Sequence, residues 1–277
     1  MLEARGLPYE LVALEPTWAL HVAADGAAAA LDELTRYSHE RSNRRPGPPS
    51  LPPFPGAGLG ALGYTAALLL VAYCAGINLF DVNWYSAGAL AHGVHGSHDW
   101  WRAFTALTLH VDAQHLLSNL LFGIAVGAIV SSMFGPGVAW ASILAAGACG
   151  NYLEMLIAPA DHRAIGASTA VFAALGLLSG FGWRSRLSLR ERWLHRWAPL
   201  IAGICLLTLL GVGDENGKAH VDVLGHLLGF IAGVGLGWTY ARAQLPRNRG
   251  AALQIAAAAG AIVVLAVSWL AGLLQAG

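Results

Sequence analysis

Seven apolar segments, each close to the length that a helix needs to cross a bilayer, dominate this chain of 277 residues. They cover residues 57–80, 115–135, 137–158, 167–183, 198–213, 222–241 and 251–275. Only 12% of the residues are charged, whereas a soluble domain carries about a quarter. A soluble fold could not cover its surface with so few charges, so the sequence predicts an all-α membrane protein.

Three clusters of arginine fix the expected direction of these spans. They lie before the first span, between the fourth and fifth, and between the sixth and seventh. Their members are Arg41, Arg44 and Arg45; Arg184, Arg186, Arg190, Arg192 and Arg196; and Arg242, Arg247 and Arg249. Seven spans put all three clusters on one side, and basic loops stay in the cytoplasm. We therefore expect a multi-pass protein of the cell's inner (plasma) membrane, bacterial in origin, with a cytoplasmic N-terminus and an external C-terminus.

The region before the first span has a different pattern. Tyr9–Leu14 and Thr17–Ala23 predict two short strands, and Ala27–Glu40 predicts an amphipathic helix. This is a small α+β segment with ββα order. The expected divisions are the cytoplasmic segment 1–45, a Pro-rich linker 46–56, a six-helix core 57–250 and a seventh helix 251–277. The balance of 16 basic and 16 acidic residues excludes a broadly basic nucleic-acid binder.

Polar side chains collect where the second, fourth and sixth spans begin. These three spans run inward, so their first residues share one depth near the outer face. Polar groups inside a bilayer are costly and call for a functional explanation. The fourth span begins Gly166-Ala-Ser168, and a serine at a helix start is either a cap or a nucleophile beside unpaired backbone N–H groups.

The position of His226 favours the role of nucleophile for Ser168 over the role of helix cap. It lies about one turn into the sixth span, level with Ser168, and can act as a general base toward a hydroxyl on a neighbouring helix. Gly229 and Gly233 follow it within a small-residue stripe that lets another helix approach closely. The alternative for His226 is a structural hydrogen bond to a backbone carbonyl.

His115 and Asn119 lie one helical turn apart on one face of the second span. Both side chains can donate hydrogen bonds, as a site for a developing oxyanion requires. Structural bonding between helices is the alternative for this pair. Near the outer end of the third span, Asn151 and Glu154 are candidates to brace the loop that leads to Ser168.

Taken in order, these residues resemble the rhomboid family of intramembrane serine proteases over about residues 57–245. The matching motifs are Trp101-Arg102-Ala-Phe-Thr105, His110, His115-x-x-x-Asn119, Gly166-Ala-Ser168 and His226-x-x-Gly229-x-x-x-Gly233. The resemblance implies a six-helix core to which the seventh span is an addition. It also implies that Ser168 is the nucleophile and His226 its general base, while His115, Asn119 and the Ser168 N–H hold the oxyanion. Trp101 and Arg102 would have a structural role.

The resemblance further implies transmembrane proteins as substrates, single-pass or other, cleaved near the outer face, with no cofactor or metal. The lipid bilayer is the other expected partner. No nucleic acid is expected to bind, and the oligomeric state is left open. Asp222 either caps the sixth helix or orients His226, and capping is the favoured role. A zinc site at His92, His95 and His98 is a minor alternative.

Two positions depart from the family pattern. Thr169 follows the serine where rhomboids usually have glycine, and Phe172 stands where a tyrosine commonly stacks on the catalytic histidine. Phenylalanine keeps the ring face, whereas a β-branched residue at 169 can crowd the turn and the packing of the fourth and sixth spans. Thr169 therefore motivates a second function, a catalytically inactive rhomboid-like protein that binds membrane helices. A small transporter or channel is the more distant alternative.

Overall fold

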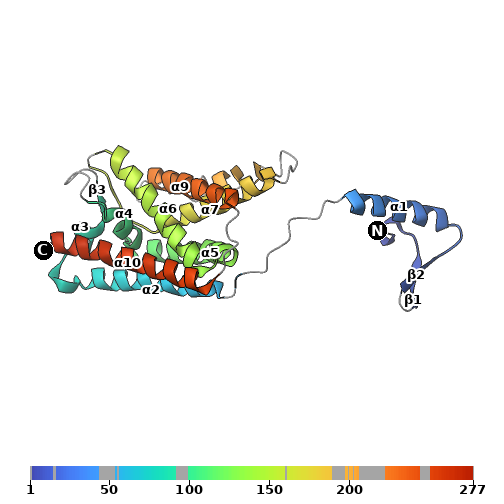
Figure 1. Ribbon diagram of the computed structural model, residues 1–277, viewed down its shortest axis with the longest axis horizontal. Helices are drawn as coiled ribbons and strands as arrows, with labels where there is room; N and C mark the ends of the chain where they lie inside the picture. The colour runs from blue at the N-terminus through green and yellow to red at the C-terminus, as the bar shows by residue number, and fades with distance from the viewer. Residues whose placement is uncertain are drawn as a thin grey trace. The chain divides into compact units, whose positions relative to one another are not determined.

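The computed structural model describes residues 2–14, 17–43, 54, 56–91, 99–159, 161–188, 197–198, 200–201, 203–205, 222–243 and 250–276. The chain divides into two compact units, Met1–Pro52 and Pro53–Gly277, both drawn in Figure 1. Most of the predicted span 198–213 lies outside the described residues, as do His92, His95 and His98.

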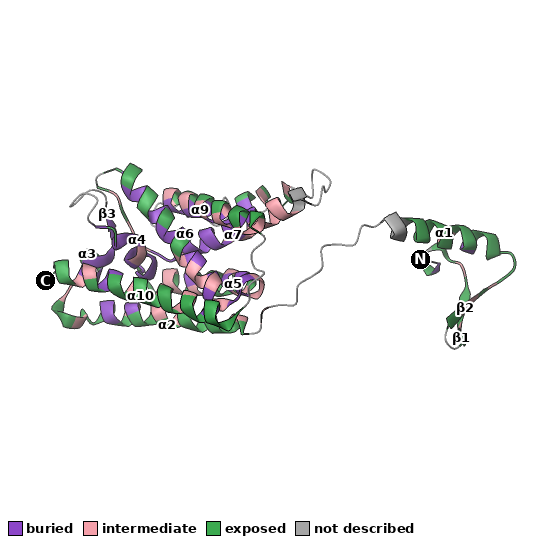
Figure 2. Ribbon diagram, in the orientation of Figure 1, coloured by how far each residue is buried: buried purple, intermediate pink, exposed green. Residues whose placement is uncertain are grey.

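The first unit has the predicted ββα order. Strands β1 (Tyr9–Leu14) and β2 (Thr17–Val22) form an antiparallel hairpin, and helix α1 (Ala27–Asn43) follows after a turn. Arg5, in the short 3-10 helix η1 (Glu3–Arg5), pairs with Glu33 of α1 at 3.2 Å. Figure 2 shows this unit as mostly exposed. It therefore contains very little hydrophobic core of its own.

The second unit contains six long helices among its described residues. They are α2 (Ala57–Gly76), α5 (Ala113–Phe134), α6 (Pro136–Ile157), α7 (Ser168–Ser188), α9 (Val223–Arg242) and α10 (Ala251–Ala276). Each coincides closely with a predicted span, although α7 continues past residue 183 so that Arg184 lies inside the helix. Of the described helices, α2, α5, α9 and α10 are long and apolar enough to cross a membrane.

Helices α7 and α9 lie side by side because glycine on one faces the backbone of the other (Figure 1). A Cβ on Gly233 would meet the carbonyl oxygen of Ala173, and one on Gly176 would meet that of Phe230. Small residues of this kind let helix backbones approach closely in a membrane. Figure 2 shows many of the buried residues in this central part of the unit.

Helix α10 is attached to the core near both of its ends. Near its start, the buried Gln254 accepts a hydrogen bond from the Val138 N–H at 3.0 Å and donates one to the Phe134 carbonyl at 3.0 Å. Near its end, the Trp269 indole donates to the Thr108 hydroxyl at 3.1 Å and packs on Trp84, with ring centroids 4.5 Å apart. Helix α10 is therefore part of the packed structure.

The connection between α2 and α5 folds into short elements that the hydrophobic pattern does not predict. They are η2 (Leu79–Asp81), α3 (Trp84–Gly88), β3 (Leu90–Ala91), α4 (Arg102–Thr105) and η4 (Ala106–Thr108). Strand β3 pairs antiparallel with β4 (Arg163–Ala164), in the connection that leads to α7. This two-residue ladder joins the first connection to the segment just before Ser168.

Candidate active site

The packing register of α7 against α9 puts His226 level with the start of α7. Gly229 faces Thr169, Gly233 faces Ala173, and Gly237 faces Leu177, a constant offset of 60 residues. His226 lies three residues before Gly229, and the same offset pairs it with Gly166, which lies two residues before Ser168. The two helices that carry the expected nucleophile and base therefore run parallel, with His226 close to the level of the α7 start.

The ring of Phe172 lies against His226. The ring centroids are 4.5 Å apart and the planes are inclined by 37°. Both side chains are buried, and Phe172 lies one turn after Ser168 on α7. The aromatic face that the family pattern puts beside this histidine is thus present without the hydroxyl.

Gly166 provides the space in which His115 approaches Ser168. Its φ of +140° is a conformation that residues with a Cβ rarely adopt. A Cβ at this position would lie 2.9 Å from His115 Nε2 and 3.4 Å from Ser168 Oγ. The imidazole and the hydroxyl therefore flank the same space, and only glycine leaves it open.

Asn119 is buried on the same face of α5, but its amide bonds within its own helix. The Nδ2 group donates to the main-chain carbonyl of His115 at 3.2 Å. The main-chain carbonyl of Asn119 accepts from the Tyr64 hydroxyl at 2.8 Å. Asp112 caps this helix by accepting from the His115 N–H at 2.7 Å. These bonds fix the first two turns of α5, which carry both expected oxyanion donors.

His110 holds the backbone that enters α7. Its Nε2 accepts a hydrogen bond from the Ala167 N–H at 3.4 Å, and its ring meets the ring of His115 edge to face at 5.1 Å. Burial, followed by the charge of His115, lowers the pKa of His110 to about 4. A neutral imidazole is needed here because only the unprotonated nitrogen can accept the Ala167 bond. Sequence reasoning noted His110 only as part of a motif.

Thr169 is accommodated by the glycine opposite it. The side chain is buried, and its Cγ2 would lie 2.8 Å from a Cβ at Gly229. Gly150 of α6 packs against Gly229 as well. The absence of a side chain at Gly229 therefore provides the room that a β-branched residue after the serine requires.

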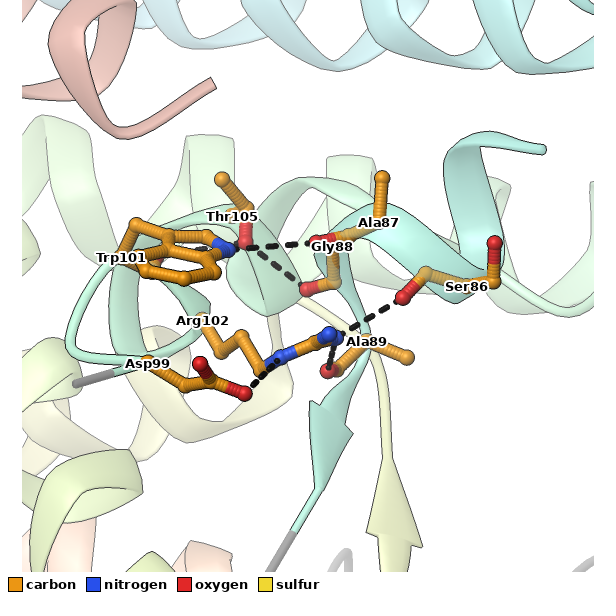
Figure 3. Close-up of polar contacts among 8 residues, drawn as sticks. All are labelled: Ser86, Ala87, Gly88, Ala89, Asp99, Trp101, Arg102 and Thr105. Atoms are coloured by element: carbon orange, nitrogen blue, oxygen red, sulfur yellow. Dashed lines mark hydrogen bonds and ion pairs between the residues drawn. The ribbon is translucent and has the colours of Figure 1, made fainter. Parts of the chain in front are cut away.

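The first connection is held together by a hydrogen-bonded group around Arg102, shown in Figure 3. The buried guanidinium pairs with Asp99 at 3.0 Å and donates to the carbonyls of Ser86 at 2.9 Å and Ala89 at 2.8 Å. The Trp101 indole donates to the Ala87 carbonyl at 3.2 Å. These contacts are structural, in agreement with the role that the resemblance implies for this motif.

Two cavities adjoin the start of α7. A cavity of about 10 Å³ is lined by Ser168, Gly166, Asn151 and Asp222 among others, about the smallest space that holds one water. A cavity of about 400 Å³ lies beside β4 and shares Ala164 and Ile165 with the small one. The space directly beside Ser168 is therefore of water size, and the larger cavity lies on the other side of Ala164 and Ile165.

Of the remaining predicted polar residues, Glu154 contacts the connection before α7, whereas Asn151 bonds to α4. Glu154 Oε1 lies 2.7 Å from His162 Nε2 in that connection, and Asn151 donates to the Ala103 carbonyl at 3.0 Å. Asp222 caps α9 by accepting from the Gly225 N–H at 2.8 Å, as expected. His162 was not singled out from the sequence, because nothing local to it indicates a partner eight residues earlier.

Comparison with known proteins agrees with this architecture. Residues 97–243, just over half of the chain, match the family model for the rhomboid domain. Rhomboid protease GluP of Bacillus subtilis is 31% identical over 177 residues, which cover 62% of this chain and 33% of that protein. Rhomboid-like protease 3 of Toxoplasma gondii is 33% identical over 138 residues, covering 49% and 50%.

A plant protein gives a similar match. RHOMBOID-like protein 7 of Arabidopsis thaliana is 32% identical over 154 residues, which cover 54% of this chain and 46% of that protein. The chain spans between a third and a half of the length of these curated relatives. Residues 97–243 contain α5, α6, α7 and α9 with the candidate site, and the chain is a multi-pass membrane protein that belongs to the rhomboid family.

Proposed function

We propose that this chain is an intramembrane serine endopeptidase that cleaves transmembrane proteins near the outer face of the membrane. The observation that carries the proposal is the parallel register of α7 and α9, together with the Phe172 ring against His226. This register supports the proposal because it puts His226 level with the start of α7, where Ser168 lines a cavity of water size. We further propose that the membrane is a bacterial plasma membrane and that residues 1–45 are cytoplasmic.

The proposed reaction proceeds through an acyl-enzyme. His226 takes the proton of Ser168 as the hydroxyl oxygen attacks the scissile carbonyl carbon. His115, Asn119 and the Ser168 N–H stabilise the oxyanion, and Gly166 provides its space. His226 returns the proton to the leaving amine, and water then hydrolyses the ester. Asn119 must exchange its bond to the His115 carbonyl for one to the oxyanion.

Labelling with a serine-directed fluorophosphonate tests the proposal. The full chain in detergent micelles is expected to be labelled, and Ser168→Ala and His226→Ala are expected to lose the label. Ser179→Ala is the matched control, because Ser179 lies on the same helix and bonds to the Leu175 carbonyl. Label that survives in Ser168→Ala would refute the assignment of the nucleophile.

The second candidate function is an inactive rhomboid-like protein that binds membrane helices, and Thr169 is the observation that favours it. If Thr169 silences the site, Thr169→Gly will gain labelling and cleavage of a transmembrane substrate in proteoliposomes. If the room at Gly229 suffices, as the protease proposal requires, the wild-type chain will be active and Thr169→Gly will change its rate by less than about tenfold, or 1.4 kcal/mol.

A further inference from the structure

A group of three potential metal ligands lies outside the Ser168 and His226 pair. Glu154 in the last turn of α6, His162 in the following connection, and Asp222 at the start of α9 each offer one ligand atom. These three atoms lie within 4.8 Å of one another. The group therefore joins the end of α6 and the connection after it to the start of α9, which is far away in the sequence.

One oxygen of Glu154 indicates that the group is built to hold something. The side chain is fully buried, and its Oε1 is paired with His162. Its Oε2 has no hydrogen-bond partner among the described residues. A buried carboxylate oxygen without a partner is costly, so its environment calls for a proton or a cation.

Asp222 supplies a second oxygen at the same point. Its Oδ1 accepts the capping bond from the Gly225 N–H, and its Oδ2 faces the α-carbon of Gly225. A Cβ at Gly225 would also lie 2.7 Å from Glu154 Oε2. Glycine at this position therefore keeps open the space in which the two carboxylates face each other.

The donor set selects the class of ligand. Two carboxylates in a poorly solvated place repel each other, and one proton shared between them would relieve that repulsion. A shared proton would leave the His162 imidazole bonded to Glu154 alone, whereas a cation would be bound by this nitrogen and by both carboxylates. One nitrogen and two oxygen ligands suit zinc-like divalent cations, which take a water in the fourth position, whereas calcium and magnesium require more oxygens.

We propose that Glu154, His162 and Asp222 form a binding site for a zinc-like divalent cation. The His162 side chain is 27% exposed and provides the route of entry. The bound cation ties the end of α6 to the connection before Ser168 and to the N-cap residue of α9. It stabilises this corner of the fold and takes no part in peptide-bond chemistry.

Zinc binding to the full chain in detergent tests the proposal. The protein carries a tag without histidine, and His92, His95 and His98 are replaced by glutamine so that bound zinc reports on this group. After chelation and addition of Zn²⁺, metal analysis is expected to find one zinc per chain, and the midpoint of thermal unfolding is expected to rise. Glu154→Gln and His162→Gln should each lower the zinc affinity at least tenfold and remove the thermal shift.

Asp161→Asn is the matched control, because Asp161 is an exposed carboxylate next to His162. It should bind zinc as the parent does. The proposal is overturned if the parent binds no zinc, if either ligand variant retains it, or if the control loses it. His162→Gln changes a partly exposed residue and keeps the test valid should Glu154→Gln fail to fold. Repeating the measurement in Ser168→Ala separates this result from the proposed protease activity.

Discussion

At the scale of single residues, the site depends on positions where a side chain is absent as much as on those where one is present. Gly166 leaves the space that His115 and Ser168 share, and Gly229 leaves the space that Thr169 fills. The sequence indicated Ser168 and His226 through their chemistry. It could not indicate which glycine serves which neighbour, because that depends on contacts between segments about 50 to 60 residues apart.

Gly166→Ala is expected to abolish fluorophosphonate labelling. The new methyl group would meet the His115 ring, and the positive φ would add a backbone cost of about 1–3 kcal/mol. Thermal unfolding and labelling of the same sample provide the measurement. Gly63→Ala is the control, because a Cβ there meets no atom within 4 Å. Full labelling of Gly166→Ala would show that the space is not needed.

His110 should make the fold sensitive to acid. Its pKa is about 4 in the folded chain and 6.5 as the ordinary value, so the unfolded chain binds the proton more tightly. Above pH 6.5 the His110 side chain is neutral, and its contribution to the free energy of unfolding is fully present. That contribution is lost as the pH falls from 6.5 to 4. The loss amounts to at most about 3 kcal/mol.

The thermal unfolding midpoint, measured between pH 7.5 and 4, tests this expectation. His110→Gln can still accept the Ala167 bond without titrating, so its midpoint should fall less over that range. Equal slopes in the parent and the variant would assign the acid sensitivity to other groups.

At the scale of secondary structure, the helices with a simple apolar pattern were predictable and the first connection was not. The bounds of α5, α6 and α10 follow from local composition, because a membrane span needs about 20 apolar residues wherever it lies. The elements α3, β3 and α4 depend on Arg102, whose guanidinium bonds carbonyls 13 and 16 residues earlier in the chain. No hydrophobic periodicity in the sequence indicates hydrogen bonds from a side chain to carbonyls that far away in the chain.

The contact between α7 and α9 should tolerate no added carbon at Gly233. In Gly233→Ala the new Cβ meets the Ala173 carbonyl oxygen and lies 2.9 Å from the Leu177 nitrogen, so the helices must separate. We expect labelling of Ser168 to fall at least tenfold, with a lower unfolding midpoint. Gly235→Ala lies on the same helix with open space around it and should behave as the parent. Equal labelling of the two variants would contradict the register argued here.

At the scale of the whole molecule, the sequence predicted the membrane class and the order of the helices from composition and charge alone. The family match then fixes the architecture over residues 97–243. From the arginine clusters we predict that the two termini lie on opposite sides of the membrane. That placement follows only if the number of spans is odd.

Reporter fusions test the orientation. Alkaline phosphatase, which is active only outside the cytoplasm, should be active when fused after Gly277 and inactive when fused before Met1. Green fluorescent protein should give the opposite pattern. Activity of the phosphatase at neither end, or at both ends, would require an even number of spans.

The attachment of α10 has a consequence for biosynthesis. Trp269 packs on Trp84 and bonds Thr108, which lies 161 residues earlier in the chain. A ribosome must therefore release α5, α6, α7, α9 and most of α10 before this contact can form. The nascent protein remains incomplete around its first connection until α10 has been synthesised.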